Sequence, residues 1–235
     1  MVDIQSLQAD IIHAIHQATN ILIVAHLRPD GDAIGSVLGM GLSLEKLGKT
    51  VQTVIQDGAP HVFRYLIGFS NIKKTIKDAY DLSIVLDCSD LTRTGEVLAG
   101  KTPDINIDHH ITNLNFANIN LVQPEAAATA QIVTDLLING NMPIDQEVAE
   151  ALLTGILTDT IGFRTTNVSP KTLRTAALLM EHGASLPELY YQGSIQKSFE
   201  ASAYWGKGLN KIQHNGNIVW STLTLADRAE VRYPG

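Results

Sequence analysis

The chain has 235 residues, 45% of them hydrophobic, and a formal net charge of −7. This length can bury a core without disulfides, and the single cysteine, Cys88, has no partner within the chain, so a reducing cytoplasm is the expected location. The acidic excess argues against a broad electrostatic grip on long duplex nucleic acid, and no apolar run approaches the roughly 20 residues that span a bilayer.

The first part of the chain predicts a β-α-β unit. Apolar residues recur at three- and four-residue spacing over 7–18, which is typical of an amphipathic helix, and a strand is expected over 21–25. The helical period restarts at Ile34 and continues to Leu47, and a second strand follows over 51–55.

Short strands are also expected over 83–86, 105–107 and 118–122. Beyond them the chain becomes helical, with Asp145 and Ser169 as the expected N-caps of two helices. The alternation of strands and helices predicts an α/β fold with a mostly parallel sheet, flanked by helices on both faces.

The C-terminal part differs in composition. Asn215-Gly216 is a strong signal for a hairpin, and a strand is expected over 218–225. We predict a first domain over residues 1–190, a helical linker over 191–211, and the beginning of a second, incomplete α/β domain over 212–235.

Carboxylates and imidazoles stand where the predicted apolar elements end. In an open parallel sheet, ligands bind outside the carboxyl ends of the strands, so side chains that are far apart in sequence can meet there. The residues concerned are His26, Asp30, Asp32, Asp87, Asp108, His109, His110 and Asp159.

This set of donors predicts a pair of metal ions. Carboxylate oxygens suit Mg²⁺ and Mn²⁺, and imidazole nitrogen shifts the preference toward Mn²⁺. Two ions about 3.5 to 4 Å apart must share a ligand, and Asp87, alone at the end of a central strand, is the candidate bridge. The predicted ligands are His26, Asp30 and Asp87 for one Mn²⁺, and Asp32, Asp87, His109 and Asp159 for the other, with Mg²⁺ as the alternative metal.

Such an ion pair activates a water for hydrolysis of a phosphate ester or anhydride. We predict that His110 contacts the phosphate or its transition state and that Asp108 orients a ligating imidazole. Ser36 and Arg93 are candidate substrate contacts. The alternatives are that Gly35 before Ser36 serves close packing, and that Arg93 forms a surface ion pair with Asp90.

Four segments resemble, in order and spacing, the four motifs of the DHH phosphoesterase family. They are the residues from His26 to Ser36, Leu86-Asp87, Asp108-His109-His110, and the residues from Gly155 to Phe163. Within the family the chain is most similar to bacterial nanoRNA hydrolases that also act as 3′-phosphoadenosine 5′-phosphate phosphatases. The strand from Trp220 to Thr224 resembles the start of their second, substrate-binding domain.

The resemblance implies a metal-dependent hydrolase that acts on short oligoribonucleotides or small phosphorylated nucleotides. It also allows an inorganic pyrophosphatase, an exopolyphosphatase or a dinucleotide phosphodiesterase. A nucleotide-binding homologue without turnover is the alternative from another class. A homodimer is a further expectation that the sequence leaves open.

Overall fold

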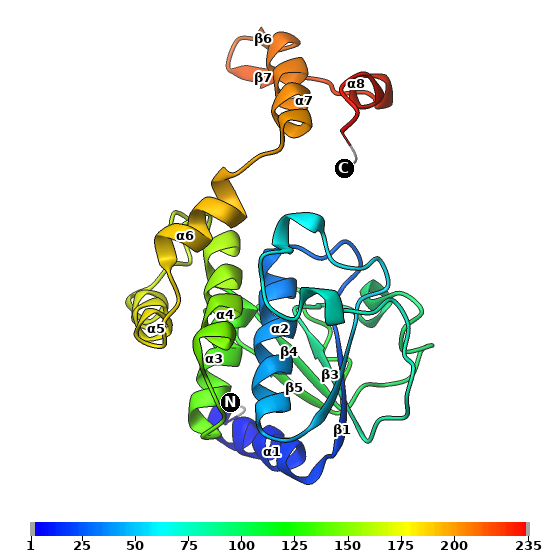
Figure 1. Ribbon diagram of the computed structural model, residues 1–235, viewed down its shortest axis with the longest axis vertical. Helices are drawn as coiled ribbons and strands as arrows, with labels where there is room; N and C mark the ends of the chain where they lie inside the picture. The colour runs from blue at the N-terminus through cyan, green and yellow to red at the C-terminus, as the bar shows by residue number, and fades with distance from the viewer. Residues whose placement is uncertain (1–2, 234–235) are drawn as a thin grey trace. The chain divides into compact units, whose positions relative to one another are not determined.

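The computed structural model describes residues 3–233. They divide into two compact units, and the boundary in the sequence falls between Ser194 and Ile195. The first unit is built on a five-stranded sheet, in the order β2-β1-β3-β4-β5 (Figure 1). All neighbouring strands are parallel, so the predicted α/β fold is confirmed. The strands are β1 (Asn20–Val24), β2 (Thr50–Val54), β3 (Leu82–Leu86), β4 (Ile105–Asp108) and β5 (Ile119–Val122).

The helices of this unit begin at polar caps. Asp145 and Ser169 are N-caps, as predicted, and Asp30 caps another helix through the amides of Asp32 and Ala33, both at 3.1 Å. Because of that cap, α2 begins at Gly31 and not at the predicted Ile34. The helices are α1 (Ile4–Gln17), α2 (Gly31–Lys46), α3 (Thr129–Asn139), α4 (Gln146–Asp159), α5 (Pro170–Glu181) and α6 (Leu186–Tyr190).

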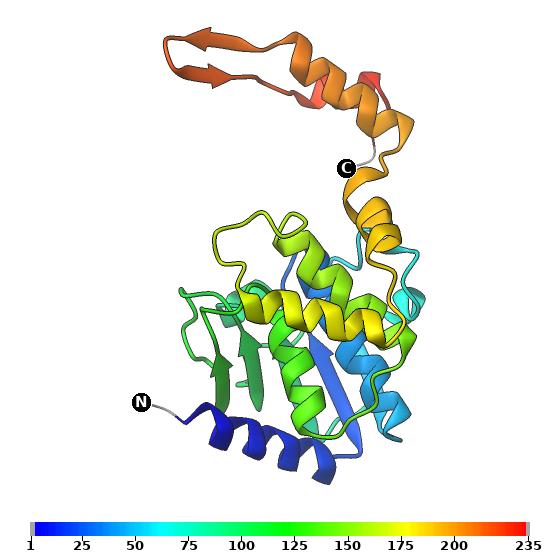
Figure 2. The same ribbon diagram turned by 90° about the vertical axis from the view of Figure 1, so that its left-hand side faces the viewer.

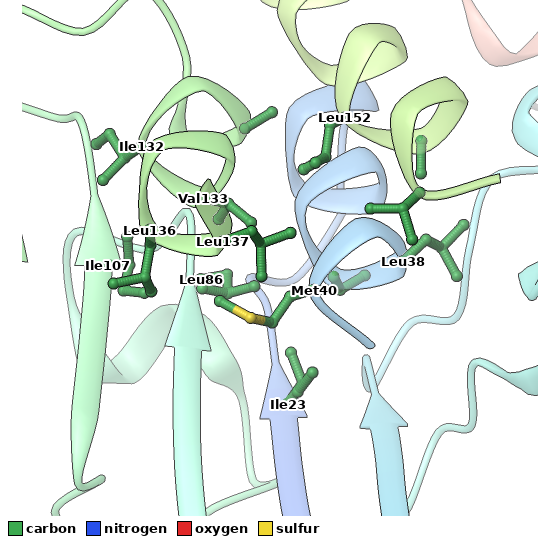
Figure 3. Close-up of a cluster of buried hydrophobic side chains, with 14 of the residues drawn as sticks. Ile23, Leu38, Met40, Leu86, Ile107, Ile132, Val133, Leu136, Leu137 and Leu152 are labelled. Atoms are coloured by element: carbon green, nitrogen blue, oxygen red, sulfur yellow. The ribbon is translucent and has the colours of Figure 1, made fainter. Parts of the chain in front are cut away.

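The main core lies between the sheet and the helices (Figure 2). In Figure 3, Ile23, Leu86 and Ile107 of three neighbouring strands lie close to Met40 of α2 and Leu136 of α3. These side chains are fully buried, and their packing fixes the height of α2 and α3 above the sheet.

The opposite face of the sheet carries a smaller core, with Leu22, Val24 and Val85 at its centre. Loops and the 3-10 turn η3 (Leu91–Thr94) cover it, so the prediction of helices on both faces needs correction. The connection from β3 to β4 contains Gly95 and Gly100 at positive φ, which breaks any long helical run there.

Helices α2 and α4 approach each other along a stripe of glycines. A Cβ atom at Gly35 would collide with the carbonyl oxygen of Ala151 and lie 2.7 Å from the amide nitrogen of Gly155. One turn further along α2, a Cβ atom at Gly39 would lie 2.5 Å from Leu152 Cγ. The two backbones therefore touch almost directly, which holds the start of α2 beside the end of α4.

The second unit contains α7 (Phe199–Asn210), the hairpin β6 (Gln213–Asn215) and β7 (Ile218–Trp220), and α8 (Leu225–Glu230). The hairpin signal is borne out, because Asn215 pairs with Ile218 and Gly216 has a φ of 56°. The strand predicted over 218–225 is too long, since Thr224 and Asp227 form a capping box that starts α8.

Helix α7 falls within the segment that the sequence assigned to a linker. It contacts α8 through an ion pair between Lys207 and Glu230 at 2.5 Å, and Tyr204 stacks on Tyr233, which follows α8. Helix α7 is therefore part of the second unit. Among residues 3–233, no helix combines the length and apolar character needed to cross a membrane.

Candidate metal centre

The predicted ligands meet at the carboxyl edge of the parallel sheet. His26 follows β1, Asp87 follows β3 and His109 follows β4, and these three strands are neighbours. The start of α2 adds Asp30 and Asp32, and the last residue of α4 is Asp159. Three strands and two helices thus deliver side chains to one place, where open parallel sheets bind ligands.

One group of donors consists of His26, Asp30 and Asp87. The Nε2 atom of His26 lies 3.9 Å from Asp30 Oδ2 and 3.6 Å from Asp87 Oδ2. The other ring nitrogen, Nδ1, lies 2.7 Å from the carbonyl oxygen of Leu27, which can only accept a hydrogen. In the neutral ring Nδ1 therefore carries the hydrogen, and Nε2 is the nitrogen that can bind a metal, as in a metal-ligating histidine.

A second group consists of Asp32, His109 and Asp159. His109 Nε2 lies 3.9 Å from Asp32 Oδ2 and 3.7 Å from Asp159 Oδ2. Its Nδ1 atom faces the carbonyl oxygen of Ala126 at 3.3 Å, so this ring also presents a free lone pair at Nε2.

Asp87 belongs to the first group and also faces the second, with one oxygen toward each. Its Oδ2 faces His26, and its Oδ1 lies 3.8 Å from His109 Nε2. The residue is 1% exposed and has a φ of 54°, a conformation that is strained for a non-glycine residue. Thr129 donates its hydroxyl hydrogen to Asp87 Oδ1 at 2.9 Å and so helps to hold the carboxylate in this orientation.

The buried carboxylates of the centre would be stabilised in their charged form by a bound cation. Burial raises the pKa of Asp32 well above its ordinary value, and the charges of Asp87 and Asp159 raise it further. Burial also raises the pKa of Asp159, with Asp87 and Asp30 adding to the shift. Burial works against the charged form of Asp87 too, but hydrogen bonding to His26 and the charges of the nearby histidines lower its pKa.

These donors fit divalent ions. Ligands about 2.1 Å from one ion lie about 3 to 4 Å apart when they are not on opposite sides of it, and the separations in both groups fall in that range. Buried carboxylates that repel one another are stabilised when a cation neutralises them. The residues present therefore suit a divalent-metal site.

A family model described as the DHH family, N-terminal domain, matches residues 20–156, which is more than half of the chain. The chain belongs to the DHH family. The membership that the motifs predicted is thus confirmed, and the match covers the sheet together with α2, α3 and most of α4.

Other DHH proteins resemble the chain over most of its length. The bifunctional oligoribonuclease and PAP phosphatase NrnA of Thermus thermophilus is 39% identical over 187 residues, which are 78% of this chain and 56% of that protein. The protein of the same name from Bacillus subtilis is 25% identical over 195 residues, 79% of this chain and 60% of that one. The matched regions thus span little more than half the length of these relatives.

A solved structure is also similar. The exopolyphosphatase-related protein from Bacteroides fragilis has a TM-score of 0.90 and 25% sequence identity, covering 97% of this chain and 72% of that one.

Within the DHH triplet itself, the fully buried Asp108 contacts the second histidine. Asp108 Oδ1 lies 2.7 Å from His110 Nδ1 and accepts the amide hydrogen of His109 at 2.8 Å. The sequence interpretation had Asp108 orient a metal-ligating imidazole, whereas the structure has it orient His110. That hydrogen bond raises the pKa of His110, whose side chain is 38% exposed.

The other two predicted substrate contacts, Arg93 and Ser36, differ in accessibility. Arg93 is exposed, and its positive charge acts on the His110 ring, so the two side chains lie in the same region. Ser36 is fully buried and donates its hydroxyl hydrogen to Asp32 Oδ1 at 3.3 Å. Ser36 therefore supports a carboxylate and does not reach a substrate. The helix begins at Gly31, so the amides near Ser36 already lie in its second turn.

Sequence reasoning missed the support that α3 gives to Asp32. The amides of Thr129 and Ala130, in the first turn of α3, donate to the two carboxylate oxygens of Asp32 at 2.6 and 2.9 Å. A helix N-terminus favours negative charge. The Thr-Ala pair carries no sequence signal for this role, because only the tertiary fold brings it to Asp32.

The chain leaves Asp159 through a left-handed turn. Ile161, Gly162 and Phe163 have φ values of 51°, 67° and 64°. The amide of Phe163 donates to Thr160 Oγ1 at 2.9 Å, and that of Gly162 donates to the carbonyl oxygen of Leu157 at 2.8 Å. A β-branched residue such as Ile161 rarely adopts positive φ. The strain is tolerated where it ends α4 directly at Asp159, which fits a functional site.

Proposed function

We propose that the chain forms the metal-binding part of a phosphoesterase that hydrolyses short oligoribonucleotides or small phosphorylated nucleotides such as 3′-phosphoadenosine 5′-phosphate. The observation that carries the proposal is the position of Asp87, with one oxygen toward His26 and the other toward His109. Two Mn²⁺ ions, or Mg²⁺ in their place, are the proposed cofactors, because the donors combine carboxylates with imidazoles. A pair of bound divalent ions supplies an activated water and neutralises charge on the phosphate.

In this proposal His110 and Arg93 act on the substrate. The His110 ring is bonded through Nδ1 to Asp108, which leaves Nε2 free to donate a hydrogen. The raised pKa of His110 keeps the ring protonated closer to neutral pH, which suits a general acid. Arg93 supplies a fixed positive charge for a phosphate oxygen.

The proposed reaction is a single displacement at phosphorus. A water oxygen bonds to phosphorus, the bond from phosphorus to the leaving ribose oxygen breaks, and that oxygen takes a proton from His110 Nε2. One proton of the water passes to solvent, and His110 is later reprotonated. Asp108 accepts a hydrogen bond from the ring throughout and keeps Nε2 directed at the leaving oxygen.

The test is a substrate panel with Mn²⁺ and with Mg²⁺. The panel contains 5′-pApA, 3′-phosphoadenosine 5′-phosphate, a linear and a cyclic dinucleotide, pyrophosphate and polyphosphate. We expect hydrolysis of the first two, and its loss in the Asp87→Ala variant. Wild-type activity that survives this substitution in a folded protein would contradict the proposal.

The alternatives are separate outcomes of the same panel. Preference for pyrophosphate or polyphosphate would indicate a pyrophosphatase or exopolyphosphatase, and preference for the other dinucleotides would indicate a dinucleotide phosphodiesterase. Tight nucleotide binding without product over a long incubation would indicate a binding protein. We further propose that the second unit is the start of a substrate-binding domain and that the protein acts in the cytoplasm; a homodimer stays a prediction.

A further inference from the structure

An asparagine in the middle of the sheet forms part of a polar network beside the metal centre. Asn106 on β4 is completely buried, where a polar side chain is costly unless it is hydrogen-bonded. Its side-chain nitrogen, Nδ2, lies 3.3 Å from the carbonyl oxygen of Val85 and 3.2 Å from that of Cys88. Its Oδ1 accepts from Asn113 at 2.8 Å, so both ends of the side chain are bonded.

Asn113 continues the network to the DHH triplet. Its Nδ2 atom lies 2.6 Å from Asp108 Oδ2, 2.8 Å from Asn106 Oδ1 and 3.2 Å from the carbonyl oxygen of Cys88. All three neighbours are acceptors, so the group at this position must be a donor. An aspartate here would face a second carboxylate and two further oxygens. The contacts therefore specify an amide and exclude the isosteric acid.

The loop around Asn113 is itself fixed. The backbone amide of Asn113 donates to the carbonyl oxygen of His110 at 3.1 Å. Asn113 Oδ1 accepts the backbone amide hydrogen of Asn115 at 2.7 Å. With its backbone and its Oδ1 already bonded, the side chain can present Nδ2 to Asp108 in one orientation.

Asp108 is consequently held at both oxygens. Oδ1 is bonded to the His110 ring and the His109 amide, and Oδ2 is bonded to Asn113. The plane of the carboxylate sets the direction of its hydrogen bond to the ring, and thus the direction in which His110 Nε2 points. We propose that Asn113 is a positioning residue that fixes the His110 ring through Asp108. The inference rests on the proposed function in one respect, the use of His110 Nε2 at the leaving oxygen.

The kinetic test compares Asn113→Ala with Thr112→Ala. Thr112 is exposed in the same loop and is a matched control that we expect to behave as wild type. On 5′-pApA, Asn113→Ala should lose about 10- to 100-fold in kcat, with KM changed by less than about two-fold, as for removal of a residue that orients a reacting group. Unchanged kcat would overturn the proposal.

A second substrate separates positioning from a general loss of structure. A nucleoside 5′-(4-nitrophenyl phosphate) releases 4-nitrophenolate, which leaves without a proton, so a misdirected His110 matters less. We expect Asn113→Ala to lose less than about three-fold on this substrate. Equal losses on both substrates would mean that Asn113 maintains the loop alone, and would overturn the proposal.

A spectroscopic measurement tests the same inference without metal or turnover. Long-range ¹H–¹⁵N spectra of the metal-free protein in alkaline solution report which ring nitrogen of His110 carries the hydrogen, and the His110→Gln variant assigns the signal. We expect hydrogen on Nδ1 in the wild type and in Thr112→Ala, and a mixture of tautomers in Asn113→Ala. An unchanged tautomer in Asn113→Ala would overturn the proposal. If the wild type proves inactive on every substrate, the proposed function fails, and the spectra still decide the role of Asn113.

Discussion

The two ends of the α2–α4 helix pair carry charge in opposite ways. At one end, Lys46 Nζ lies 2.9 Å from Asp145 Oδ2 and 2.9 Å from Glu147 Oε2. Partial burial works against the charged form of Asp145, yet the hydrogen bond from Lys46 lowers its pKa. At the other end, Asp32 and Asp159 lie in one group of donors, and burial and neighbouring carboxylates raise the pKa of both. No lysine or arginine among the described residues forms an ion pair with either.

The difference indicates that the end of the helix pair with Asp32 and Asp159 reduces the stability of the fold and serves a function. Asp145 caps the N-terminus of α4, where the helix dipole favours an anion, whereas Asp159 is the last residue of α4, where the dipole disfavours one. A chain selected for stability alone would place a basic residue at the second position. The position of Asp159 at the unfavourable terminus of α4, beside the buried Asp32, indicates that a bound cation completes that end of the pair.

The largest expected effect comes from removing the shared carboxylate. In Asp87→Asn, hydrolysis should fall about 1,000-fold or more, because several kcal/mol of charge stabilisation in the transition state are lost. Asparagine tolerates positive φ better than other replacements, so the variant should fold. Steady-state rates with Mn²⁺ and calorimetric counting of bound ions check the prediction, with Asp10→Asn on the exposed face of α1 as control. Wild-type rates in Asp87→Asn would remove the bridge from the mechanism.

A single added methyl group at Gly35 should disturb the close contact between α2 and α4. Gly35→Ala should destabilise the protein by about 3 kcal/mol, because the new Cβ atom meets the backbone of α4. In Gly41→Ala on the same helix, the nearest atom to the new Cβ is Thr53 Oγ1 at 3.3 Å, a side-chain atom that has to shift slightly. The better helix propensity of alanine, worth up to about 1 kcal/mol, offsets that contact, so the net change should be small. Urea unfolding measures both; equal effects would contradict the close approach.

Metal binding should remove the repulsion at the acidic end. At 100 times its dissociation constant, Mn²⁺ should add about 2.7 kcal/mol to the free energy of unfolding, and excess chelator should abolish the gain. Because the folded-state pKa values of Asp32 and Asp159 are raised, the metal-free fold is favoured by these groups below their unfolded values and loses that contribution as pH rises through the folded ones.

The gain from Mn²⁺ should therefore grow as pH rises over the same interval, because the ion binds the ionised carboxylates. Thermal unfolding with and without Mn²⁺ across a pH series measures it. A gain that is the same at acidic and neutral pH would contradict the placement of the ions at these carboxylates.

The smallest effect is expected at the opposite end. Lys46→Met should cost about 0.5 kcal/mol at low salt and less at high salt, because the ion pairs of Lys46 are partly exposed and screened. The lowered pKa of Asp145 means that its contribution is present above the unfolded value and is lost as pH falls through the folded one. Urea unfolding at two salt concentrations checks the first statement, and a pH series checks the second. A loss as large as that of Gly35→Ala would contradict the difference between the two ends.

Much of this architecture could be predicted from the sequence because its signals are local. The short apolar runs predicted the strands, and the ends of those runs predicted where His26, Asp87 and His109 would lie, since parallel strands present their carboxyl ends together. Asp145 and Ser169 were recognisable as caps from their own neighbours.

The remaining features depend on distant contacts. Gly35 and Gly39 are adapted to α4, more than a hundred residues away, and the amides of α3 that hold Asp32 are visible only once the fold is formed. Ser36 was assigned to a substrate because its register on α2 was unknown. The helix-poor face of the sheet was missed because alternating strands and polar segments predict a crossover without fixing its form.

The hold of α3 on Asp32 has a consequence for selectivity among ions. With one amide on each oxygen and the Ser36 hydroxyl on Oδ1, the carboxylate cannot swing outward to accommodate a larger sphere of ligands. Calcium is coordinated by more oxygens at longer distances, whereas magnesium and manganese prefer compact octahedral coordination. We therefore expect these hydrogen bonds to Asp32 to favour the smaller ions, and two of the three come from backbone amides that mutation of a side chain cannot easily remove.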